Sequence, residues 1–300
     1  MRLAVTGATG FVGGRLLSAA RDAGHDLRAL TRRPMPPRDG VEWVAGSLED
    51  SAALDRLCAG ADAVIHVAGV INARDKAGFE AGNVAGTATM LAAAKSTGML
   101  RFVHVSSLAA REPSLSRYGA SKARAEVLVK TSGIPFAIVR PPAVYGPGDR
   151  ETLELFKMAR RGLIALPPAG RLSLLHADDL ANLLIALASE TPSGLTLEPD
   201  DGHAGGYSHR DFAALLGRAV GRNAFAAPIP QAILRTAAAL DGLIRRDGAK
   251  LTPDRVAYFC HPDWVADPAR GVPSELWRPA IDTAEGLKET ADWYRAEGWL

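Results

Sequence analysis

A tyrosine and a lysine four residues apart, Tyr118 and Lys122 in the segment Tyr-Gly-Ala-Ser-Lys, could carry acid–base chemistry. On a helix, residues with this spacing lie on the same face. Because a nearby ammonium favours the phenolate, we expect Lys122 to lower the pKa of Tyr118 from its ordinary value of about 10. Tyr118 is therefore a candidate general acid or base, and Lys122 could also donate to a ribose. Taken alone, the spacing also fits an ordinary helical pair.

Two serines, Ser106 and Ser107, directly follow the apolar run Val103-His-Val105. If this run is a strand of a parallel sheet, the serines stand at its carboxyl end, which is the edge where open sheets bind ligands. A hydroxyl at this edge can hold a carbonyl or alkoxide oxygen beside Tyr118. The alternative is a role in a turn or a helix cap.

Three glycines spaced by three residues, Gly7, Gly10 and Gly13, follow the apolar run Leu3-Ala-Val5 and open a helical pattern. In this context the first glycine allows a tight turn, the second lets the backbone approach a pyrophosphate, and the third lets helix and strand pack closely. The N–H groups at the start of the helix would then face an anion. The pattern predicts a dinucleotide site, and a glycine-rich turn that binds nothing is the alternative.

The second apolar run ends at Leu30-Thr-Arg-Arg33. At this point a carboxylate would bind the ribose 2′-hydroxyl of NAD, whereas an arginine suits the 2′-phosphate of NADP. Because Arg32 and Arg33 stand there and no carboxylate does, the sequence favours NADP(H), with NAD(H) as the second option. The alternative is a solvated arginine pair.

Apolar, strand-like runs alternate with helical patterns through the first half of the chain. We expect strands over residues 3–5, 27–30, 41–44, 63–67, 102–105 and 136–139, and helices over 11–23, 51–58, 79–97 and 118–131. Solid apolar runs of this kind are typical of strands that are buried on both faces. The alternation predicts an α/β fold, a doubly wound parallel sheet with helices on both sides.

Beyond residue 139 the pattern becomes less regular. Helices are expected over residues 152–161, 178–188, 208–220 and 231–245, and a strand over 172–175. Ser208 resembles the N-cap of the third of these helices. We therefore expect a dinucleotide-binding domain over residues 1–165 and about 170–192, and a smaller, partly interleaved substrate domain over about 193–300 with parts of 145–170.

The composition argues against several classes of function. The 300 residues are 47% apolar and 23% charged, the formal net charge is +2, and basic residues occur in pairs rather than in long runs. The sequence thus carries no electrostatic sign of a nucleic acid or membrane partner, and no apolar stretch is long enough to span a bilayer. No ligand spacing suggests a metal. With no leader-like start, we expect a cytoplasmic protein with a small-molecule substrate.

The glycine turn, the serine and the Tyr–Lys pair together resemble the short-chain dehydrogenase/reductase family. The matching residues are Thr6, Gly7, Gly10, Gly13, Ser107, Tyr118 and Lys122. Three further segments, residues 83–87, 140–148 and 175–180, resemble its extended branch. That branch includes nucleotide-sugar epimerases and dehydratases, dihydroflavonol reductases and hydroxysteroid dehydrogenases. The resemblance implies a Rossmann fold and covers about residues 1–190.

The resemblance also implies roles for individual residues. The catalytic set would be Ser107, Tyr118 and Lys122. The cofactor site would contain Gly7, Thr9, Gly10, Phe11, Val12, Gly13, Arg32, Ser47, Leu48, Ala68, Gly69, Asn83, Ser106, Tyr118, Lys122, Pro141 and Val144. Many members have an aspartate where Ser47 stands, and Ser47 is expected to replace the contact of that aspartate to adenine. Pairing of two copies through the helices over 79–97 and 118–131 would give a homodimer.

Two departures from the family pattern favour its reductase-like members. Nucleotide-sugar enzymes usually carry an asparagine where Ala143 stands and an arginine where Leu172 and Ser173 stand. The main hypothesis is an NADP(H)-dependent oxidoreductase that moves a hydride between the nicotinamide and a hydroxyl or carbonyl carbon of a small organic substrate, while Tyr118 transfers the proton. The alternatives are a nucleotide-sugar epimerase or dehydratase with tightly bound NAD, and a non-catalytic dinucleotide-binding subunit or sensor.

Overall fold

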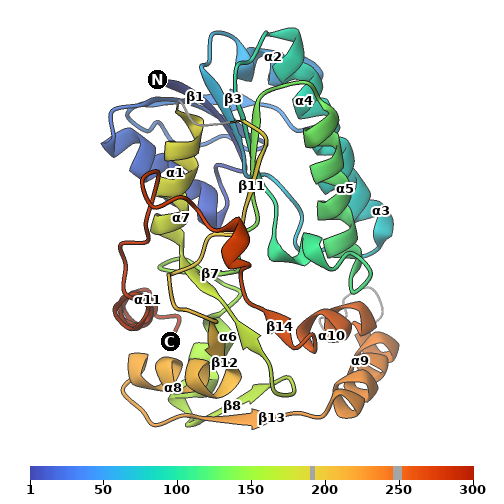
Figure 1. Cartoon of the computed structure of the whole chain (residues 1–300), viewed down its shortest axis with the longest axis vertical. Helices are drawn as coiled ribbons and strands as arrows, with labels where there is room; N and C mark the ends of the chain where they lie inside the picture. The colour runs from blue at the N-terminus through green and yellow to red at the C-terminus, as the bar shows by residue number, and fades with distance from the viewer. Residues whose placement is uncertain (190–192, 246–251) are drawn as a thin grey trace. The chain divides into compact units, whose positions relative to one another are not determined.

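A computed structural model of the chain describes residues 1–189, 193–245 and 252–300. It contains two compact units (Figure 1). The first, called the sheet unit, comprises Met1–Pro141, Ala177–Glu198 and Val272–Trp277. The second unit comprises Pro142–His176, Pro199–Gly271 and Arg278–Leu300. Both units are therefore built from segments that are far apart in the sequence.

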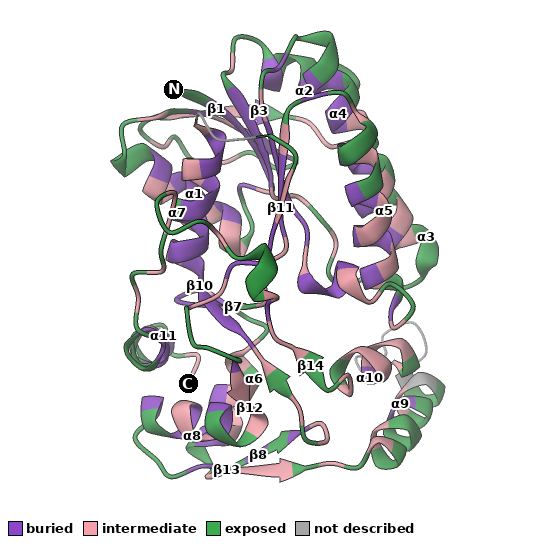
Figure 2. Ribbon diagram, viewed as in Figure 1, coloured by how far each residue is buried: buried purple, intermediate pink, exposed green. Residues whose placement is uncertain are grey.

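A seven-stranded sheet forms the centre of the sheet unit, with all neighbouring strands parallel. Its order is β11-β6-β5-β4-β1-β2-β3. The strands are β1 (Arg2–Thr6), β2 (Asp26–Thr31), β3 (Val41–Ala45), β4 (Ala63–His66), β5 (Phe102–Val105), β6 (Phe136–Val139) and β11 (Leu195–Leu197). The central strands are buried on both faces, as their solid apolar runs require and as the purple strands in Figure 2 show. The α/β fold with a doubly wound parallel sheet is confirmed, whereas β11 was not predicted.

Helices cover both faces of this sheet (Figure 1). On one face α1 (Phe11–Asp22) packs against α7 (Ala177–Ala188), and on the other α2 (Ser51–Cys58) and α5 (Arg117–Thr131) flank α4 (Gly86–Ser96). Each helix turns an apolar stripe inward, as Leu16 and Leu17 of α1 show by being fully buried. This packing fixes α1 and α5, the two helices that carry the predicted site residues.

The predicted single helix over 79–97 is interrupted by a π-helical turn. A short helix α3 (Lys76–Phe79) runs into the π turn η1 (Glu80–Ala85) and then into α4. A Cβ on Gly82 would lie 2.3 Å from Val70 Cγ2, and the Asn83 side chain bonds to both the N–H and the carbonyl of Val70. We infer that this close approach of the loop after β4 favours the wider π turn. Such turns are frequent at functional sites.

Within its described residues, the second unit contains three small sheets and five α-helices. The sheets pair β7 (Ala143–Tyr145) with β10 (Leu174–His176), β9 (Arg171–Leu172) with β12 (Tyr207–Ser208) and β14 (Asp263–Trp264), and β8 (Leu163–Leu166) with β13 (Phe225–Pro228). The helices are α6 (Leu153–Arg160), α8 (His209–Ala219), α9 (Gln231–Arg245), α10 (Pro253–Phe259) and α11 (Thr283–Ala296). Their core contains Tyr145, Phe156, Phe212, Leu216 and Tyr294.

The strand predicted over 172–175 is in fact two strands, β9 and β10, in different sheets. Ser173 separates them, because its hydroxyl donates to Asp200 (3.0 Å) and accepts from the N–H of Ala266 (3.1 Å). A buried hydroxyl with these partners redirects the chain where the apolar pattern indicates one continuous strand. Across the part of the chain that the structure describes, no helix is both long and apolar enough to cross a bilayer.

Candidate active site

The glycine turn after β1 is shaped by two positions that tolerate no side chain. Gly7 has a φ of +73°, and a Cβ on it would lie 2.6 Å from the backbone nitrogen of Ala68. A Cβ on Gly13 would lie 2.0 Å from the carbonyl oxygen of Gly7. Backbone strain and steric overlap thus both require glycine here. The turn is pressed between the loop after β4 and the first turn of α1.

Gly10 is different, because the protein itself leaves room beside it. A Cβ there would meet only the Gly7 carbonyl oxygen, at 3.2 Å, and the residue is exposed. Gly10 is also the N-cap of α1 and offers no side-chain cap. The first helical bond runs from Gly14 N to Gly10 O, so the preceding N–H groups have no partner within the helix.

These features fit a dinucleotide pyrophosphate. The donors at the start of α1 belong to Phe11, Val12 and Gly13, and the first turn carries no acidic residue. Thr9 is exposed beside them. A helix N-terminus with free donors and no negative charge attracts an anion. The structure therefore brings five of the predicted cofactor residues, Thr9 to Gly13, together at one place.

Arg32 and Arg33 follow β2 in a turn made by Thr31. The Thr31 hydroxyl donates to the Arg33 carbonyl (2.7 Å) and accepts from the Arg33 N–H (3.2 Å). Both arginines are exposed, and within the described residues neither guanidinium forms an ion pair. The local turn therefore presents two free cations at the carboxyl end of β2.

The loop after β4 meets α5 and the π turn at one point. A Cβ on Gly69 would lie 3.0 Å from both Asn83 Oδ1 and Lys122 Nζ. Asn83 accepts from Val70 N (2.7 Å) and donates to Val70 O (3.0 Å) and to Ser121 Oγ (2.8 Å). Asn83 therefore ties the loop to α5, which is a positioning contact that the motif alone did not reveal.

Ser107 and Tyr118 are brought together by the absence of a side chain on Gly119. Ser107 is the N-cap of the 3₁₀ turn η2 (Leu108–Arg111), and its hydroxyl accepts from Ala109 N (3.2 Å). A Cβ on Gly119 would lie 2.5 Å from the Ala109 carbonyl oxygen. Because glycine stands there, α5 lies directly against η2, which brings the Ser107 hydroxyl close enough to the Tyr118 phenol to influence its pKa.

The pKa of Tyr118 differs from the expectation based on its neighbour Lys122. Burial raises the pKa of Tyr118 above 10, with the hydrogen bond from Ser107 opposing that rise. The prediction that Lys122 lowers this pKa is therefore wrong, because loss of hydration is the largest effect on the phenol and Lys122 is not among the groups that shift it. Burial also lowers the pKa of Lys122 to about 8, although Glu126 favours its charge. Lys122 Nζ donates to the Val105 carbonyl (2.9 Å), which holds it against β5.

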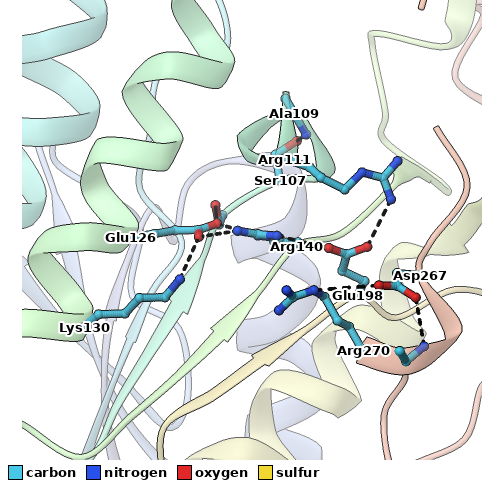
Figure 3. Close-up of polar contacts among 11 residues, drawn as sticks. Ser107, Ala109, Arg111, Glu126, Lys130, Arg140, Glu198, Asp267 and Arg270 are labelled. Atoms are coloured by element: carbon cyan, nitrogen blue, oxygen red, sulfur yellow. Dashed lines mark hydrogen bonds and ion pairs between the residues drawn. The ribbon is translucent and has the colours of Figure 1, made fainter. Parts of the chain in front are cut away.

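A buried ionic network lies behind the serine pair (Figure 3). Arg140, after β6, bonds to Glu126 of α5 through Nε (2.8 Å) and Nη2 (2.7 Å), and to Glu198, after β11, through Nη1 (3.1 Å). Arg111 at the end of η2 donates to Glu198 (3.3 Å). Glu126 and Glu198 are 2% and 1% exposed. The network joins α5, η2 and the ends of two strands.

Ser106 belongs to this network rather than facing away from it. Its hydroxyl donates to Glu126 Oε1 (2.6 Å) and is 3% exposed. Burial alone would raise the pKa of Glu126, but the hydrogen bonds from Arg140 and Ser106 hold it below its ordinary value. The spacing of Tyr118, Lys122 and Glu126, each four residues apart, is the sequence signal that could have found the glutamate.

The remaining predicted residues are more dispersed. Ser47 accepts from Glu49 N (3.2 Å) in the turn after β3, and Leu48 fills the space left by Gly86, where a Cβ would lie 2.7 Å from Leu48 Cδ1. Pro141 accepts from Leu108 N (3.1 Å) within the sheet unit. Val144 belongs to β7 of the second unit, whereas the other predicted residues belong to the sheet unit.

Two buried histidines lie beside Lys122. The rings of His66 and His104 stack with centroids 5.5 Å apart. His66 bonds to Thr6 (2.7 Å) and Thr87 (3.1 Å), whereas neither ring nitrogen of His104 has a hydrogen-bond partner among the described residues. Burial first, and the charge of Lys122 second, lowers the pKa of His66 to about 3 and that of His104 well below its ordinary value. Both are therefore neutral core residues at physiological pH.

Comparisons with known proteins point in one direction. A family model described as the NAD dependent epimerase/dehydratase family matches residues 3–197. Ceramide reductase of Caulobacter vibrioides is 40% identical over 99% of this chain and 96% of its own length. The 4-hydroxy-2-methyl-3-oxo-4-farnesyl-3,4-dihydroquinoline-1-oxide ketoreductase of Stigmatella aurantiaca is 32% identical over 80% of this chain and 79% of its own length.

A solved structure, described as MoeE5 in complex with UDP-glucose and NAD, superposes with a TM-score of 0.75. It covers 99% of both chains at 22% identity. At this identity the likeness establishes the fold and carries no inference about the substrate.

Proposed function

The chain belongs to the NAD-dependent epimerase/dehydratase family, the extended branch of the short-chain dehydrogenases/reductases, and from this premise we propose that it is an NADP(H)-dependent ketoreductase of apolar, lipid-like substrates. Membership makes it an NAD(P)-dependent enzyme. The proposal adds the direction of the reaction, the cofactor and the substrate class.

The observation that supports reduction is that the similar curated proteins are named as reductases. Tyr118 is available as the proton donor, because burial raises the pKa of its phenol, and the Ser107 hydroxyl lies near it. A protonated phenol next to a serine hydroxyl can supply two donors to a carbonyl oxygen and then release its proton to the forming alkoxide. Reduction of a ketone needs this proton, whereas oxidation of an alcohol needs the phenolate.

Lys122 and the cofactor complete the site. A nicotinamide dinucleotide supplies the hydride when bound. The Nζ of Lys122 is held by Val105 and lies beside Gly69, in the loop that follows β4. Its role would be to position the ribose and to stabilise negative charge as Tyr118 gives up its proton. The proton from Tyr118 and the hydride together convert a C=O bond to an alcohol.

The choice of NADP(H) rests on the turn after β2. Arg32 and Arg33 are exposed and unpaired within the described residues, and no carboxylate stands at this position of the turn. The planar guanidinium can form two parallel hydrogen bonds to a phosphate. A 2′-phosphate would therefore be favoured over a 2′-hydroxyl at this place.

The substrate class rests on the two similar reductases. Their names specify a ceramide in one case and a farnesyl-bearing oxo compound in the other, so both act on molecules with long apolar parts. The relative named ceramide reductase matches almost the whole of this chain, including the second unit. We therefore place the ketone of the substrate on a lipid-like molecule.

A second candidate, a nucleotide-sugar epimerase or dehydratase, is favoured by the description of the family model, which names epimerases and dehydratases. Such an enzyme reduces and reoxidises a held cofactor within one turnover. The two candidates therefore differ in whether the cofactor exchanges with solution.

The test is NADPH consumption by the purified chain with a long-chain oxidised ceramide, a short ketone and UDP-glucose. We expect turnover with the oxidised ceramide, loss of about 10²-fold or more in kcat for Tyr118→Phe, and normal activity for the surface control Ser96→Ala. Tightly held NAD with turnover of UDP-glucose would establish the second candidate instead.

A further inference from the structure

Five arginines without ion pairs lie on α8 and next to the strand pair β8–β13 of the second unit. They are Arg160, Arg161, Arg210, Arg218 and Arg222, and within the described residues none of them contacts a carboxylate closely enough to form an ion pair. Arg160 and Arg161 precede β8, and Arg222 precedes β13, its parallel partner. Because the two strands run side by side in the same direction, these arginines lie at the same edge of the pair.

Three of these arginines, Arg210, Arg218 and Arg222, line a groove of about 790 Å³ along α8. Arg210, Ala214 and Arg218 repeat every four residues and so line one face of this helix. Leu166 and Phe225 from the β8–β13 pair are among the apolar residues that line it too. Among the described lining residues there is no carboxylate. The nearest in sequence, Asp211, accepts from Ser208 Oγ (2.6 Å) instead.

Large apolar side chains are exposed beside these cations. Leu163 and Phe225 are paired in register across β8 and β13, and they are 58% and 70% exposed. The next helix along the chain, α9, begins at Gln231 after β13 ends at Pro228. It carries three more exposed apolar side chains, Ile233, Leu240 and Ile244, whereas Ala238 is buried. Figure 2 shows most of this helix as exposed. Exposed apolar side chains of this number call for a partner.

We propose that this surface of the second unit docks the protein on an anionic phospholipid membrane. The arginines would bind lipid phosphates, and the exposed side chains of Leu163 and Phe225 on β8 and β13 would enter the acyl boundary, as in an interfacial surface that combines charge with apolar contact. A second copy of the chain is a poorer occupant. In a two-fold contact this surface would meet itself, and its unpaired arginines would face one another.

This proposal stands on the surface alone and does not depend on the proposed function. It replaces the expectation, drawn from the absence of a long basic run, that the protein has no membrane partner. The five arginines come from three separate segments, 160–161, 210–218 and 222, so only folding gathers them. If the substrate is a lipid, docking would place the enzyme where that substrate resides.

The experiment is vesicle flotation of the full-length chain. Vesicles of phosphatidylcholine with about 30% phosphatidylglycerol are compared with pure phosphatidylcholine at about 0.1 M salt. We expect binding to the anionic vesicles that weakens as salt rises. Since each basic residue near such a surface contributes about fivefold, R218E/R222E should lower the partition coefficient at least tenfold. Phe225→Ser should lower it as well, because this exposed ring supports no core.

The matched control is R56E/K95E, which changes the net charge equally on exposed residues of the sheet unit. It should change vesicle binding less than twofold, and all variants should bind NADPH as the parent does. Equal loss in the control, or no binding of the parent to anionic vesicles, overturns the proposal. A dimer that R218E/R222E dissociates, with no vesicle binding by the parent, would assign the surface to contact between copies.

Discussion

Arg140 donates two hydrogen bonds to the carboxylate of Glu126, from Nε to Oε1 at 2.8 Å and from Nη2 to Oε2 at 2.7 Å. The pair joins the end of β6 to α5, the helix that carries Tyr118. The Glu126 carboxylate also accepts a hydrogen bond from Ser106, the residue that precedes Ser107. Burying two charges costs free energy that their attraction only offsets, so we infer that the Arg140–Glu126 pair positions the site more than it stabilises the fold. Removing one member is nevertheless destabilising, because it leaves the other charge buried without that partner.

The first prediction concerns Glu126→Gln. The substitution keeps the shape of the side chain but removes one of the two buried carboxylates that pair with Arg140. We expect a loss of about 3 kcal/mol in the free energy of unfolding, measured by urea denaturation. Glu154→Gln, which removes a carboxylate from an exposed pair with Lys157, should cost less than about 0.5 kcal/mol.

The pH dependence of this variant has a definite sign. The folded-state pKa of Glu126 lies below its unfolded value, so its stabilisation is present above about pH 4.3 and is lost as the pH falls through the folded pKa. The difference between parent and Glu126→Gln should therefore shrink on acidification. A difference that stays constant down to low pH would contradict the ionic interpretation.

Gly119→Ala tests the contact that places Ser107 beside Tyr118. The added Cβ would lie 2.5 Å from the Ala109 carbonyl oxygen, so α5 or η2 must shift. We expect kcat to fall at least tenfold, since misplacement of about 1 Å is costly in catalysis, with a loss of about 1–3 kcal/mol in stability. Cofactor binding and unfolding are measured on the same preparation.

The matched control is Gly14→Ala in α1, where a new Cβ has nothing within 4 Å. This change should leave stability unaltered or raise it by up to about 1 kcal/mol, because alanine favours the helix. If Gly119→Ala is as harmless as Gly14→Ala, the glycine is not what brings the two hydroxyl groups together.

His104 should make the protein sensitive to acid. The folded-state pKa values of His66 and His104 lie below their unfolded values. The unfolded chain therefore takes up protons that the folded chain refuses, and stability falls as the pH drops below about 6.5. His104→Leu removes a ring whose nitrogens have no partner among the described residues, so it should flatten this slope. Unfolding midpoints measured between about pH 7 and pH 4.5 give the pH dependence of stability in parent and variant. An unchanged slope in His104→Leu would show that this histidine is not a source of the acid sensitivity.

The rate of reduction should depend on Lys122. Its pKa of about 8 predicts that kcat is constant through neutral pH and declines as the ammonium loses its proton above about pH 8. Lys122→Met should remove this decline and lower kcat throughout. Lys130→Met, two turns further along the same face of α5, should keep the parental profile. A profile that is flat in the parent would show that the charge of Lys122 is not required.

Local patterns account for the part of the site that the sequence predicts well. Gly7 and Gly13 meet within one turn, and Tyr118 and Lys122 share one helix, so short-range spacing suffices. The apolar runs likewise located six of the seven central strands.

What the sequence could not show depends on long-range packing. Glu198 reaches Arg140 only because β11 adds to the sheet beside β6, with Leu197 opposite Val139. The raised pKa of Tyr118 likewise follows from burial by distant segments and not from the neighbouring lysine. The π turn at Glu80–Ala85 also depends on a loop that precedes it, which no helical periodicity reports.

The last prediction concerns the cofactor. Arg32→Ala should weaken NADPH binding about tenfold or more, as expected for loss of a charged hydrogen bond to a phosphate, and should leave NADH binding within about twofold. Arg56→Ala, an exposed arginine on α2, serves as the control and should change neither affinity. Parallel fluorescence titrations with the two cofactors give the measurement. If Arg32→Ala weakens the binding of both cofactors equally, the arginine supports the turn after β2 and does not select the 2′-phosphate. If the parent binds NADH more tightly than NADPH, the assignment of NADP(H) is wrong, and NAD binds without a carboxylate in this turn.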